Sequence, residues 1–291
     1  MMPHSNWYKH RSNAVTAQSS VNLAVPFDKA NLELQDELIK KFMREFTFKL
    51  ASTPEDIEKS LALRHEVFVQ ELGYKMQEKD NNLESDEYDS SSYHCILTHK
   101  RTDKTAGCFR IVTTQNPNGE GYRKLPVEEH GNEGISHLTL HPNMLPREYI
   151  CEASRLAISK EFRVSQNSFN YKKSCQELPP LPESVKEVSP LILISIFLAA
   201  YSLAEIMGNR HMYAMMAPTL PRLLRKSGFE FIRLGETFEF HGKRNVFYIN
   251  RSLAISGVQH ALYPLHQCIY QEIKNQVDEH SSIIKASYSP S

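Results

Sequence analysis

The spacing of apolar residues changes several times along the chain, and each change predicts a new element. Apolar residues recur at helical spacing over residues 31–43 and alternate with polar residues over residues 46–50, which predicts an edge helix followed by a strand. Thr53 and Pro54 then mark a helix start, because a threonine can cap the first turn and a proline is tolerated within it. The N-terminal part of the chain is therefore expected to run helix, strand, helix.

Strands dominate the middle of the chain. Residues 93–99 and 107–114 flank a turn-rich segment and predict a hairpin, and residues 149–159 predict a further strand. The strongly apolar segment 191–207 is too short for a membrane span and contains an acidic residue, so it predicts a buried core helix. Ser189 is expected to cap that helix.

The C-terminal part repeats the alternation. Strands are expected at 211–217, 229–235 and 244–250, with a helix over 218–228 ended by a glycine. Helical turns interrupted at Pro264 should follow, with a frayed end. Such a mixture predicts an α/β or α+β sheet with helices on its faces.

The predicted organisation is one main domain with appendages. Residues 1–43 are expected to be an N-terminal extension, partly disordered, and residues 253–291 a C-terminal helical extension. Between them, residues 44–252 form the main domain. A polar segment with three prolines, residues 163–188, is expected to be a flexible insertion within it.

Composition narrows the function classes. The chain has 291 residues, 41% of them hydrophobic, which is enough for one large domain. Its 34 basic and 34 acidic side chains cancel, so no general nucleic-acid binder is expected. Five separated cysteines without a CxxC spacing, and no apolar signal-peptide core near the start, predict a cytoplasmic protein with reduced thiols and no transmembrane span.

Candidate chemistry lies in a spaced polar set among apolar segments, since charged residues are rarely buried unless they are paired. The set comprises Arg64, Phe68, Tyr74, Glu84, Asp86, Asp89, Arg110, Glu152, Ser154 and Arg155. Its acidic members lie in residues 73–92, a polar stretch expected to be a surface loop. Glu152 and Ser154 should share one strand face, whereas Arg155 should point the other way unless a bulge redirects it.

This set resembles the pattern of the acyl-homoserine-lactone synthases and the related N-acyl amino acid synthases. The motif is Arg64-x3-Phe68-x5-Tyr74, then Glu84-x-Asp86-x2-Asp89, then Arg110, then Glu152-x-Ser154-Arg155. The stretch from Met212 to Arg244 is similar to one branch, the acyltransferases associated with PEP-CTERM/exosortase systems. Two features depart from the lactone synthases: Tyr74, where they usually have tryptophan, and the proline-containing insertion.

The resemblance implies a GNAT-like acyl-CoA N-acyltransferase fold, with a central mixed, mostly antiparallel twisted sheet and helices on both faces. It also implies transfer of a fatty acyl group from the thioester of an acyl carrier protein, or of CoA, to the amine of an amino acid or similar small acceptor. No metal and no tightly bound cofactor is required. Acyl carrier protein is favoured as the partner, because no glycine for a pyrophosphate loop stands between Arg155 and Gly208.

Within that reaction the residues divide into roles. Glu152 would take the proton of the incoming ammonium, and backbone N–H groups near Ser154 and Arg155 would hold the developing oxyanion. Arg64, Asp86, Asp89 and Arg110 either bind the acceptor or lock the acidic loop against the sheet by salt bridges, and Glu84 would also bind the acceptor. Phe68 and Tyr74 either line the acceptor pocket or fill the core.

Two alternatives to the N-acyltransferase remain open for the function. An acyl-homoserine-lactone-type signal synthase is the nearest rival, and a non-catalytic module that binds acyl groups or their carrier is the other. Metal binding by His137 and His141 is disfavoured because a loop does not bring residues four apart together and no third ligand is near. Cys151 adjoins Glu152, but no histidine is placed to activate it, so an inert thiol is expected.

Overall fold

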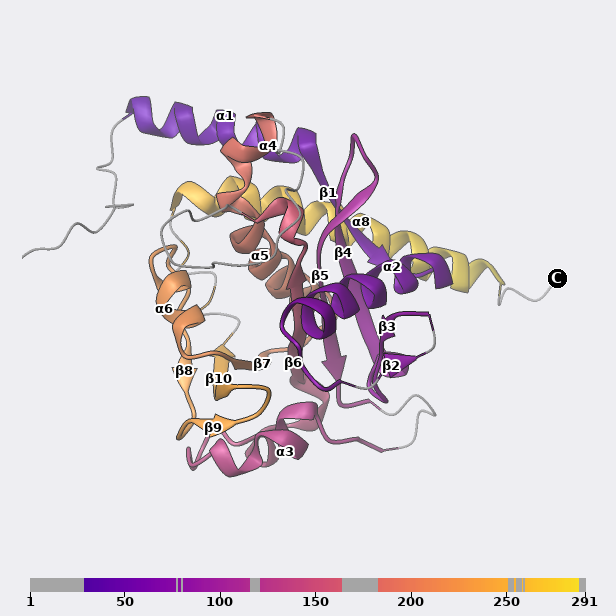
Figure 1. The fold of residues 1–291 in the computed structure, drawn as a ribbon, viewed down its shortest axis with the longest axis vertical. Coiled ribbons are helices and arrows are strands. Elements are labelled where there is room, and N and C mark those ends of the chain that lie inside the picture. Colours follow the sequence, from indigo (N-terminus) through magenta and orange to yellow (C-terminus); the bar gives the residue numbers. More distant parts are fainter. Residues whose placement is uncertain are drawn as a thin grey trace, which may run out of the picture.

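One twisted sheet organises the molecule in the computed structural model, which describes residues 29–76, 78–79, 81–115, 121–163, 183–250, 254, 258 and 260–287 (Figure 1). The order of its main strands is β1 Phe46–Ala51, β4 Ser92–His99, β5 Lys104–Thr113, β6 Ile150–Ile158, β7 His211–Met216, β10 Lys243–Asn250 and β8 Ile232–Arg233. All pairs are antiparallel except β6 with β7. The mixed, mostly antiparallel sheet expected from the sequence is therefore confirmed.

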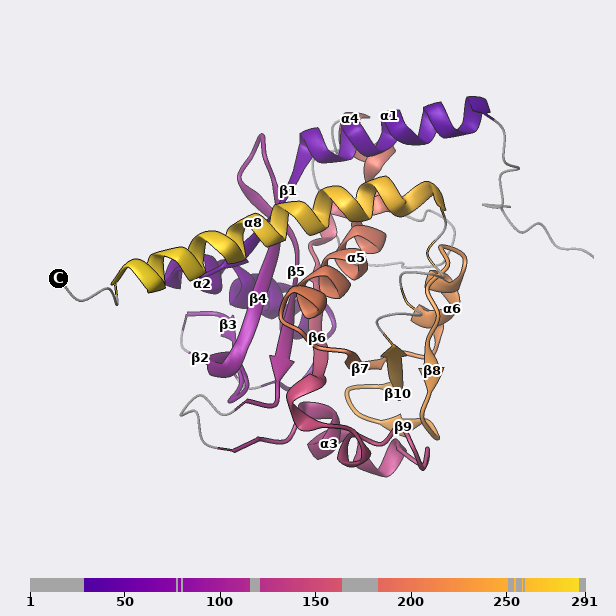
Figure 2. The ribbon, with the colours of Figure 1, turned by 180° about the vertical axis from the view of Figure 1, so that it is seen from behind.

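Helices cover both faces of this sheet. They are α1 Lys29–Glu45, α2 Pro54–Arg64, α3 Pro126–His130, α4 Glu183–Val188, α5 Pro190–Ile206, α6 Thr219–Arg225 and α8 Tyr263–Ser287. Figure 1 shows α2 in front of the strands, and Figure 2 shows α5 and α8 crossing them on the opposite side. In the part of the chain that the structure describes, no helix is long and apolar enough to cross a membrane.

The central strands are buried on both sides because each face has its own core. Cys95 and Leu97 of β4 belong to the large apolar cluster that includes α5 and α8. Ile96, the residue between them, belongs instead to a small cluster with Leu63 and Val67 on the α2 side. Alternate side chains of one strand thus enter different cores, which explains why β4 is apolar without interruption over Cys95–Leu97.

The helix after β1 begins as the sequence predicts and then changes its winding. Thr53 accepts a hydrogen bond from the backbone N–H of Asp56 at 3.2 Å, which caps α2. From His65 to Glu71 the chain continues as a π-helix, a form often found at functional sites. Arg64 therefore ends the regular helix, and Phe68 lies in the wider turn that follows it.

Two short elements differ from the predictions. Ser189 does not cap α5: its backbone is helical, and its hydroxyl donates to the carbonyl of Lys186, because α4 runs almost directly into α5. Helix α4 occupies the end of the predicted insertion 163–188, and its residues Val185 and Val188 are buried. Residues 164–182 of the insertion lie outside the described chain. The strand expected at 229–235 is limited to Ile232–Arg233.

The N- and C-terminal segments are more helical than expected. Helix α1 covers the predicted helix 31–43, and residues 1–28 of the predicted extension lie outside the described chain. The predicted interruption at Pro264 is wrong, because α8 begins at Tyr263 and the proline therefore lies in its first turn, where a missing N–H is tolerated.

Side chains of α8 bind the free backbone groups of β1, the edge strand. The Glu272 carboxylate accepts hydrogen bonds from the Phe48 N–H at 3.1 Å and from the Thr47 hydroxyl. Gln276 accepts from the Leu50 N–H and donates to the Phe48 carbonyl, both at 2.9 Å. An open strand edge invites pairing with another chain, so α8 completes the sheet at this edge.

We expect Glu272→Ala to lower the free energy of unfolding by about 1–3 kcal/mol, because two donors on β1 lose a charged acceptor. Glu279→Ala is the matched control, since Glu279 is exposed on the same helix, and it should change stability by less than about 0.5 kcal/mol. Urea denaturation measures both. Equal losses would mean that α8 contributes only its apolar packing.

Candidate active site

A cavity of about 310 Å³ opens where β6 and β7 separate. The two strands pair in parallel only from Ile150 to Glu152 and from His211 to Tyr213. Beyond that point, residues 153–156 of β6 and 214–216 of β7 line the cavity from opposite sides. The parting of the strands thus makes a slot in the middle of the sheet.

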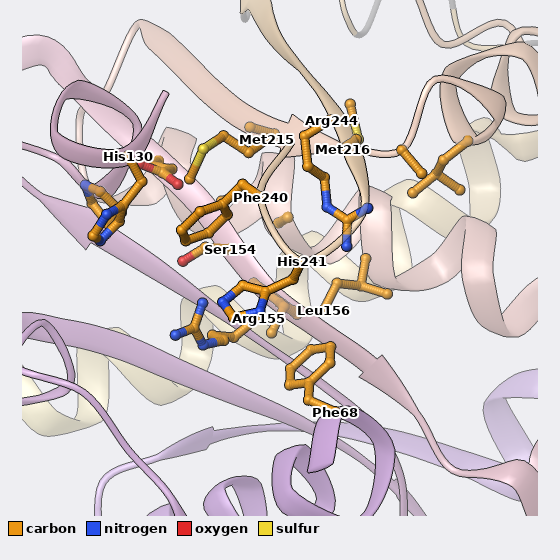
Figure 3. A pocket seen from close by; sticks show the side chains of 18 of the residues that line it. Phe68, His130, Ser154, Arg155, Leu156, Met215, Met216, Phe240, His241 and Arg244 are labelled. Carbon is orange, nitrogen blue, oxygen red and sulfur yellow. The ribbon is translucent and has the colours of Figure 1, made fainter. Parts of the chain in front are cut away.

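Two kinds of residue line this cavity (Figure 3). One group is apolar and belongs to the core around α5; its members include Phe109, Phe197, Ala200, Met212, Met216 and Ile249. The other group is polar or aromatic and includes Phe68, Tyr74, Asp86, Glu152, Ser154 and Arg155. Six of the ten residues singled out in the sequence therefore line one cavity.

The charged residues of the predicted set form a closed ring of alternating charge, which we call the charge ring. Its members are Arg64, Glu84, Arg155, Asp86, Arg110 and Asp89. Every arginine contacts two carboxylates and every carboxylate contacts two arginines. Three positive and three negative charges therefore neutralise one another, which is how charged groups can be buried.

The geometry of the charge ring is specific. Arg64 donates to Glu84 through Nε and to both carboxylate oxygens of Asp89 at 2.7 and 3.1 Å. Arg110 binds both oxygens of Asp86 and also contacts Asp89 at 2.6 Å. Arg64 and Arg110 are each 1% exposed and Glu84 is 0% exposed. A guanidinium that binds both oxygens of one carboxylate fixes the orientation of the two groups as well as balancing their charges.

The expected surface loop is therefore anchored by three carboxylates, of which Glu84 is fully buried. Within residues 73–92, a short hairpin of β2 Glu78–Lys79 and β3 Leu83–Glu84 carries Glu84 into the protein. Burial alone would raise the pKa of Asp86, but the hydrogen bonds and charge of Arg110 outweigh it and hold that pKa below its usual range. The same balance, with Arg64 as the main partner, lowers the pKa of Asp89.

A bulge in β6 places Arg155 in the charge ring. Cys108 of β5 lies opposite Ala157, whereas Arg110 lies opposite Ser154, so β6 has one extra residue in this interval. Arg155 takes a left-handed conformation, with φ of 54°. Its Nε donates to Glu84 at 3.1 Å and its Nη2 to Asp86 at 2.8 Å. The bulge thus redirects Arg155, as the sequence allowed, and turns it toward the acidic loop.

Glu152 is the buried carboxyl at the point where the strands part. It is 0% exposed; Oε2 accepts the N–H of Val127 at 2.6 Å, and Oε1 has no hydrogen-bond partner in the described residues. Burial raises the pKa of Glu152 to about 8, although the Val127 N–H and the charges of Arg110 and Arg155 oppose the shift. A carboxyl with a pKa near neutrality can exchange protons in the cavity.

Ser154 lies beside Glu152 but is already engaged. Its hydroxyl oxygen accepts a hydrogen bond from Nε of Arg110 at 3.0 Å, so the side chain is held by the charge ring.

The predicted aromatic pair also lines the cavity: the rings of Phe68 and Tyr74 are stacked, with centroids 6.3 Å apart. Both rings line the cavity, so filling the core is not their only role.

The hairpin between β9 Phe238–Glu239 and β10 supplies cavity residues that the sequence did not single out. Phe240, His241 and Arg244 all line the cavity. The His241 ring stacks on Tyr74 at 5.3 Å, and Arg244 donates to the Tyr74 hydroxyl at 3.0 Å. The only local signal was a histidine–glycine turn next to basic residues, which is also typical of an ordinary exposed hairpin.

Other candidates behave as structural residues. Cys151 is buried and free, and burial raises the pKa of its thiol, which disfavours the reactive thiolate. His137 accepts the N–H of Leu140, and His141 caps a short 3₁₀ turn. Across the described ranges, no three histidine, cysteine, aspartate or glutamate side chains are grouped to hold a metal.

Comparison with known proteins identifies similar families. The sequence profile of the acetyltransferase (GNAT) domain matches residues 63–169, which include the whole charge ring and Glu152. An acyl-homoserine-lactone synthase from Aliivibrio fischeri is 25% identical over 187 residues, covering 64% of this chain and 80% of that protein. The profile ends before residues 212–244, so the resemblance to the PEP-CTERM/exosortase branch remains a prediction.

Solved structures agree on the fold. The acyl-homoserine-lactone synthase LasI has a TM-score of 0.51 at 16% identity and covers 74% of this chain and 96% of its own. A CoA-dependent acyl-homoserine lactone synthase, BjaI, solved with SAM and isopentyl-CoA, has a TM-score of 0.50 at 16% identity, with coverage of 77% and 89%. The GNAT-like fold implied by the motif is confirmed.

We expect Arg64→Met to lower the free energy of unfolding by about 3–5 kcal/mol, because Glu84 and Asp89 would be left buried without one of their two cations. The control is Lys104→Met, whose ion pair with Glu161 is exposed, and it should cost less than about 1 kcal/mol. Chemical denaturation at pH 7 measures both. Equal, small losses would mean that the charge ring adds no net stability.

The pH dependence of stability gives a second check on the charge ring. The folded-state pKa values of Asp86 and Asp89 lie below the ordinary value of 3.8, so their contribution is present above that pH and is lost as the pH falls below it. We expect the stability of the wild type to fall steeply in this acid range. Asp89→Asn should make the dependence shallower, and an unchanged slope would contradict the lowered pKa.

Proposed function

We propose that this chain, an acyltransferase of the GNAT-like superfamily that includes the acyl-homoserine-lactone synthases, moves a fatty acyl group from a carrier thioester to the amine of an amino acid or similar small acceptor. The observation that carries the proposal is Glu152. It is a buried carboxyl with one unpaired oxygen, placed where β6 and β7 part and bordering a cavity with both apolar and polar walls.

Glu152 acts as the general base in this proposal. An amino group is protonated at neutral pH and must lose a proton before its nitrogen can attack the thioester carbon. The raised pKa of Glu152, about 8, makes the carboxylate basic enough to accept that proton directly or through one water. The Val127 N–H holds the carboxyl by its other oxygen, so the unpaired Oε1 is the acceptor atom.

The β6 bulge is the proposed site for stabilising the negative charge that develops on the thioester oxygen. Attack of the nitrogen forms a C–N bond and places a negative charge on the thioester oxygen; collapse then breaks the C–S bond, and the departing thiolate takes up a proton. We assign stabilisation of that oxygen to backbone N–H groups at Ser154 and Arg155. Both residues line the cavity at the bulge, where β6 has left its partner strand β7.

The apolar wall suits the acyl chain. Phe197 and Ala200 of α5, with Met212 and Met216 of β7, continue the cavity into the core. Methionine side chains adapt their shape, which fits a flexible alkyl chain better than a rigid ring. We therefore place the fatty acyl group between β6 and β7, with its thioester carbon near Glu152.

Acyl carrier protein is our proposed donor. The chain has no glycine between Arg155 and Gly208, where a pyrophosphate-binding loop of a CoA enzyme would be expected. Arg222 and Arg225 are exposed on α6 and offer positive charge to an acidic carrier. Three buried free cysteines support the cytoplasm as the location of the protein.

A lactone signal synthase is the second candidate, supported by the similarity to the Aliivibrio fischeri enzyme. Against it, Tyr74 stands where the lactone synthases usually have tryptophan. The similarity to acyltransferases supports an enzyme over a non-catalytic acyl-binding module.

The proposal is tested by incubating the purified protein with a mixture of amino acids and a long-chain fatty acyl group, carried as a thioester either by acyl carrier protein or by CoA. We expect release of the free carrier thiol and an N-acyl amino acid by mass spectrometry, with faster turnover of the carrier protein than of CoA. Product with SAM in place of the amino acids, as an acyl-homoserine lactone, would select the second candidate. Acyl binding without transfer to any amine would overturn both.

We expect Glu152→Gln to lower kcat by about 10²–10⁴-fold, because an amide cannot accept the proton. In the wild type, kcat/KM should rise with pH through about 8, as Glu152 loses its own proton, and this step should vanish in the variant. Glu148→Gln, at an exposed position, is the control and should keep both rate and profile. A wild-type profile without this step would remove Glu152 as the base.

A further inference from the structure

Arg244 lines the cavity and has no ion-pair partner among the residues that the structure describes. Its Nη2 donates to the hydroxyl of Tyr74 at 3.0 Å and its Nη1 to the carbonyl of Lys243 at 3.1 Å. Both acceptors are neutral, and no carboxylate of the described chain forms an ion pair with Arg244. The guanidinium therefore lies at the cavity wall without a countercharge from the described residues.

The other arginines near the cavity are less suited to bind an anion, because each is paired with carboxylates. Arg155 also lines the cavity, but it is bound by Glu84 and Asp86. Arg64 and Arg110 are buried and each contacts two carboxylates within the charge ring. The positive charge of each of these three arginines is already balanced by two carboxylates, so a substrate anion gains less by pairing with them.

Arg244 is held in place by the hairpin that carries it. His241 and Gly242 both have positive φ, 50° and 88°, and the Phe240 N–H closes the turn on the Gly242 carbonyl at 3.0 Å. The His241 ring stacks on Tyr74, and Phe240 stacks on His130 at 4.9 Å. Figure 3 shows Arg244 and His241 beside one another above Phe68. The guanidinium is thus directed before any ligand binds.

We propose that Arg244 binds the carboxylate of the acceptor, which makes it the residue that selects an amino acid over a simple amine. This inference rests on the proposed function. A planar guanidinium pairs well with a carboxylate, and here Tyr74 fixes one of its nitrogens. The carboxylate bound by Arg244 does not react, so the product is an N-acyl amino acid and not a lactone.

A phosphate of the donor's pantetheine arm is the competing anion, and the size of the cavity favours the carboxylate. Arg244 and Glu152 line the same cavity of about 310 Å³. In an amino acid the carboxylate lies close to the amine, so one small molecule can reach both residues. The phosphate of the donor is separated from the reacting sulfur by the whole length of the pantetheine arm.

The test uses L-phenylalanine as the acceptor probe, because Phe68, Tyr74 and Phe240 give the cavity an aromatic wall. Its carboxamide, L-phenylalaninamide, has the same amine and ring without the negative charge. We expect Arg244→Gln to raise KM for the acid by about tenfold or more, with KM for the carboxamide and for the acyl donor changed less than twofold. Arg244→Lys should recover part of the loss.

The controls separate the possible outcomes. Lys243→Gln, at the exposed neighbouring position, should leave all three KM values unchanged. A raised KM for the acyl donor would assign Arg244 to the phosphate instead, and equal losses for acid and carboxamide would make its role structural. Either result overturns the inference.

A binding measurement keeps the inference testable without turnover. Calorimetric titration of the wild type with L-phenylalanine and with L-phenylalaninamide should show a preference for the acid that Arg244→Gln removes. If the wild type acylates no amine, the proposed function fails, but this preference can still be measured. Equal binding of both probes by the wild type, or an unchanged preference in the variant, would overturn the role of Arg244.

Discussion

The charge ring is the constraint on which the rest of the site depends. It joins the end of α2, the acidic loop, β5 and the bulge of β6 through three arginines and three carboxylates. Because the charges cancel and three of the six residues are fully buried, the ring is stable only when all of these segments are in place together. The same ring holds the Ser154 hydroxyl and adds positive charge near Glu152, so the loop and the proposed base are positioned by one set of contacts.

The parting of β6 and β7 turns this scaffold into a reaction site. Strand pairing ends at Glu152, the residue with an unpaired carboxylate oxygen, and the slot beyond it extends toward the apolar core around α5. The β9–β10 hairpin adds Arg244 to the cavity wall, and no carboxylate among the described residues forms an ion pair with it. The arginines of the charge ring are paired with carboxylates and shape the site, whereas Arg244 is the residue that we propose binds a substrate anion.

Much of the fold and part of the site could be predicted from the sequence, and each wrong or missing prediction has a physical cause. Thr53 as a cap and the pairing of β4 with β5 follow from local rules, and both are present. The expected cap at Ser189 is wrong because a preceding helix occupies its place. Arg244 was missed because a basic residue after a hairpin turn is usually solvated, and only the folding of that hairpin over Tyr74 makes it a cavity residue.

By itself, the sequence determined most element types and the set of polar residues that does not belong in a core, because periodicity and burial preferences are local properties. The mixed sheet was implied by the family resemblance. The tertiary structure alone decided how that set is used. Pairing each arginine with two carboxylates requires segments that are distant in the chain to meet, and turning Arg155 toward them requires an extra residue in one strand of a pair. Long-range contacts of this kind leave no periodic signal in the sequence, so only the fold shows that the six charged residues form one closed ring.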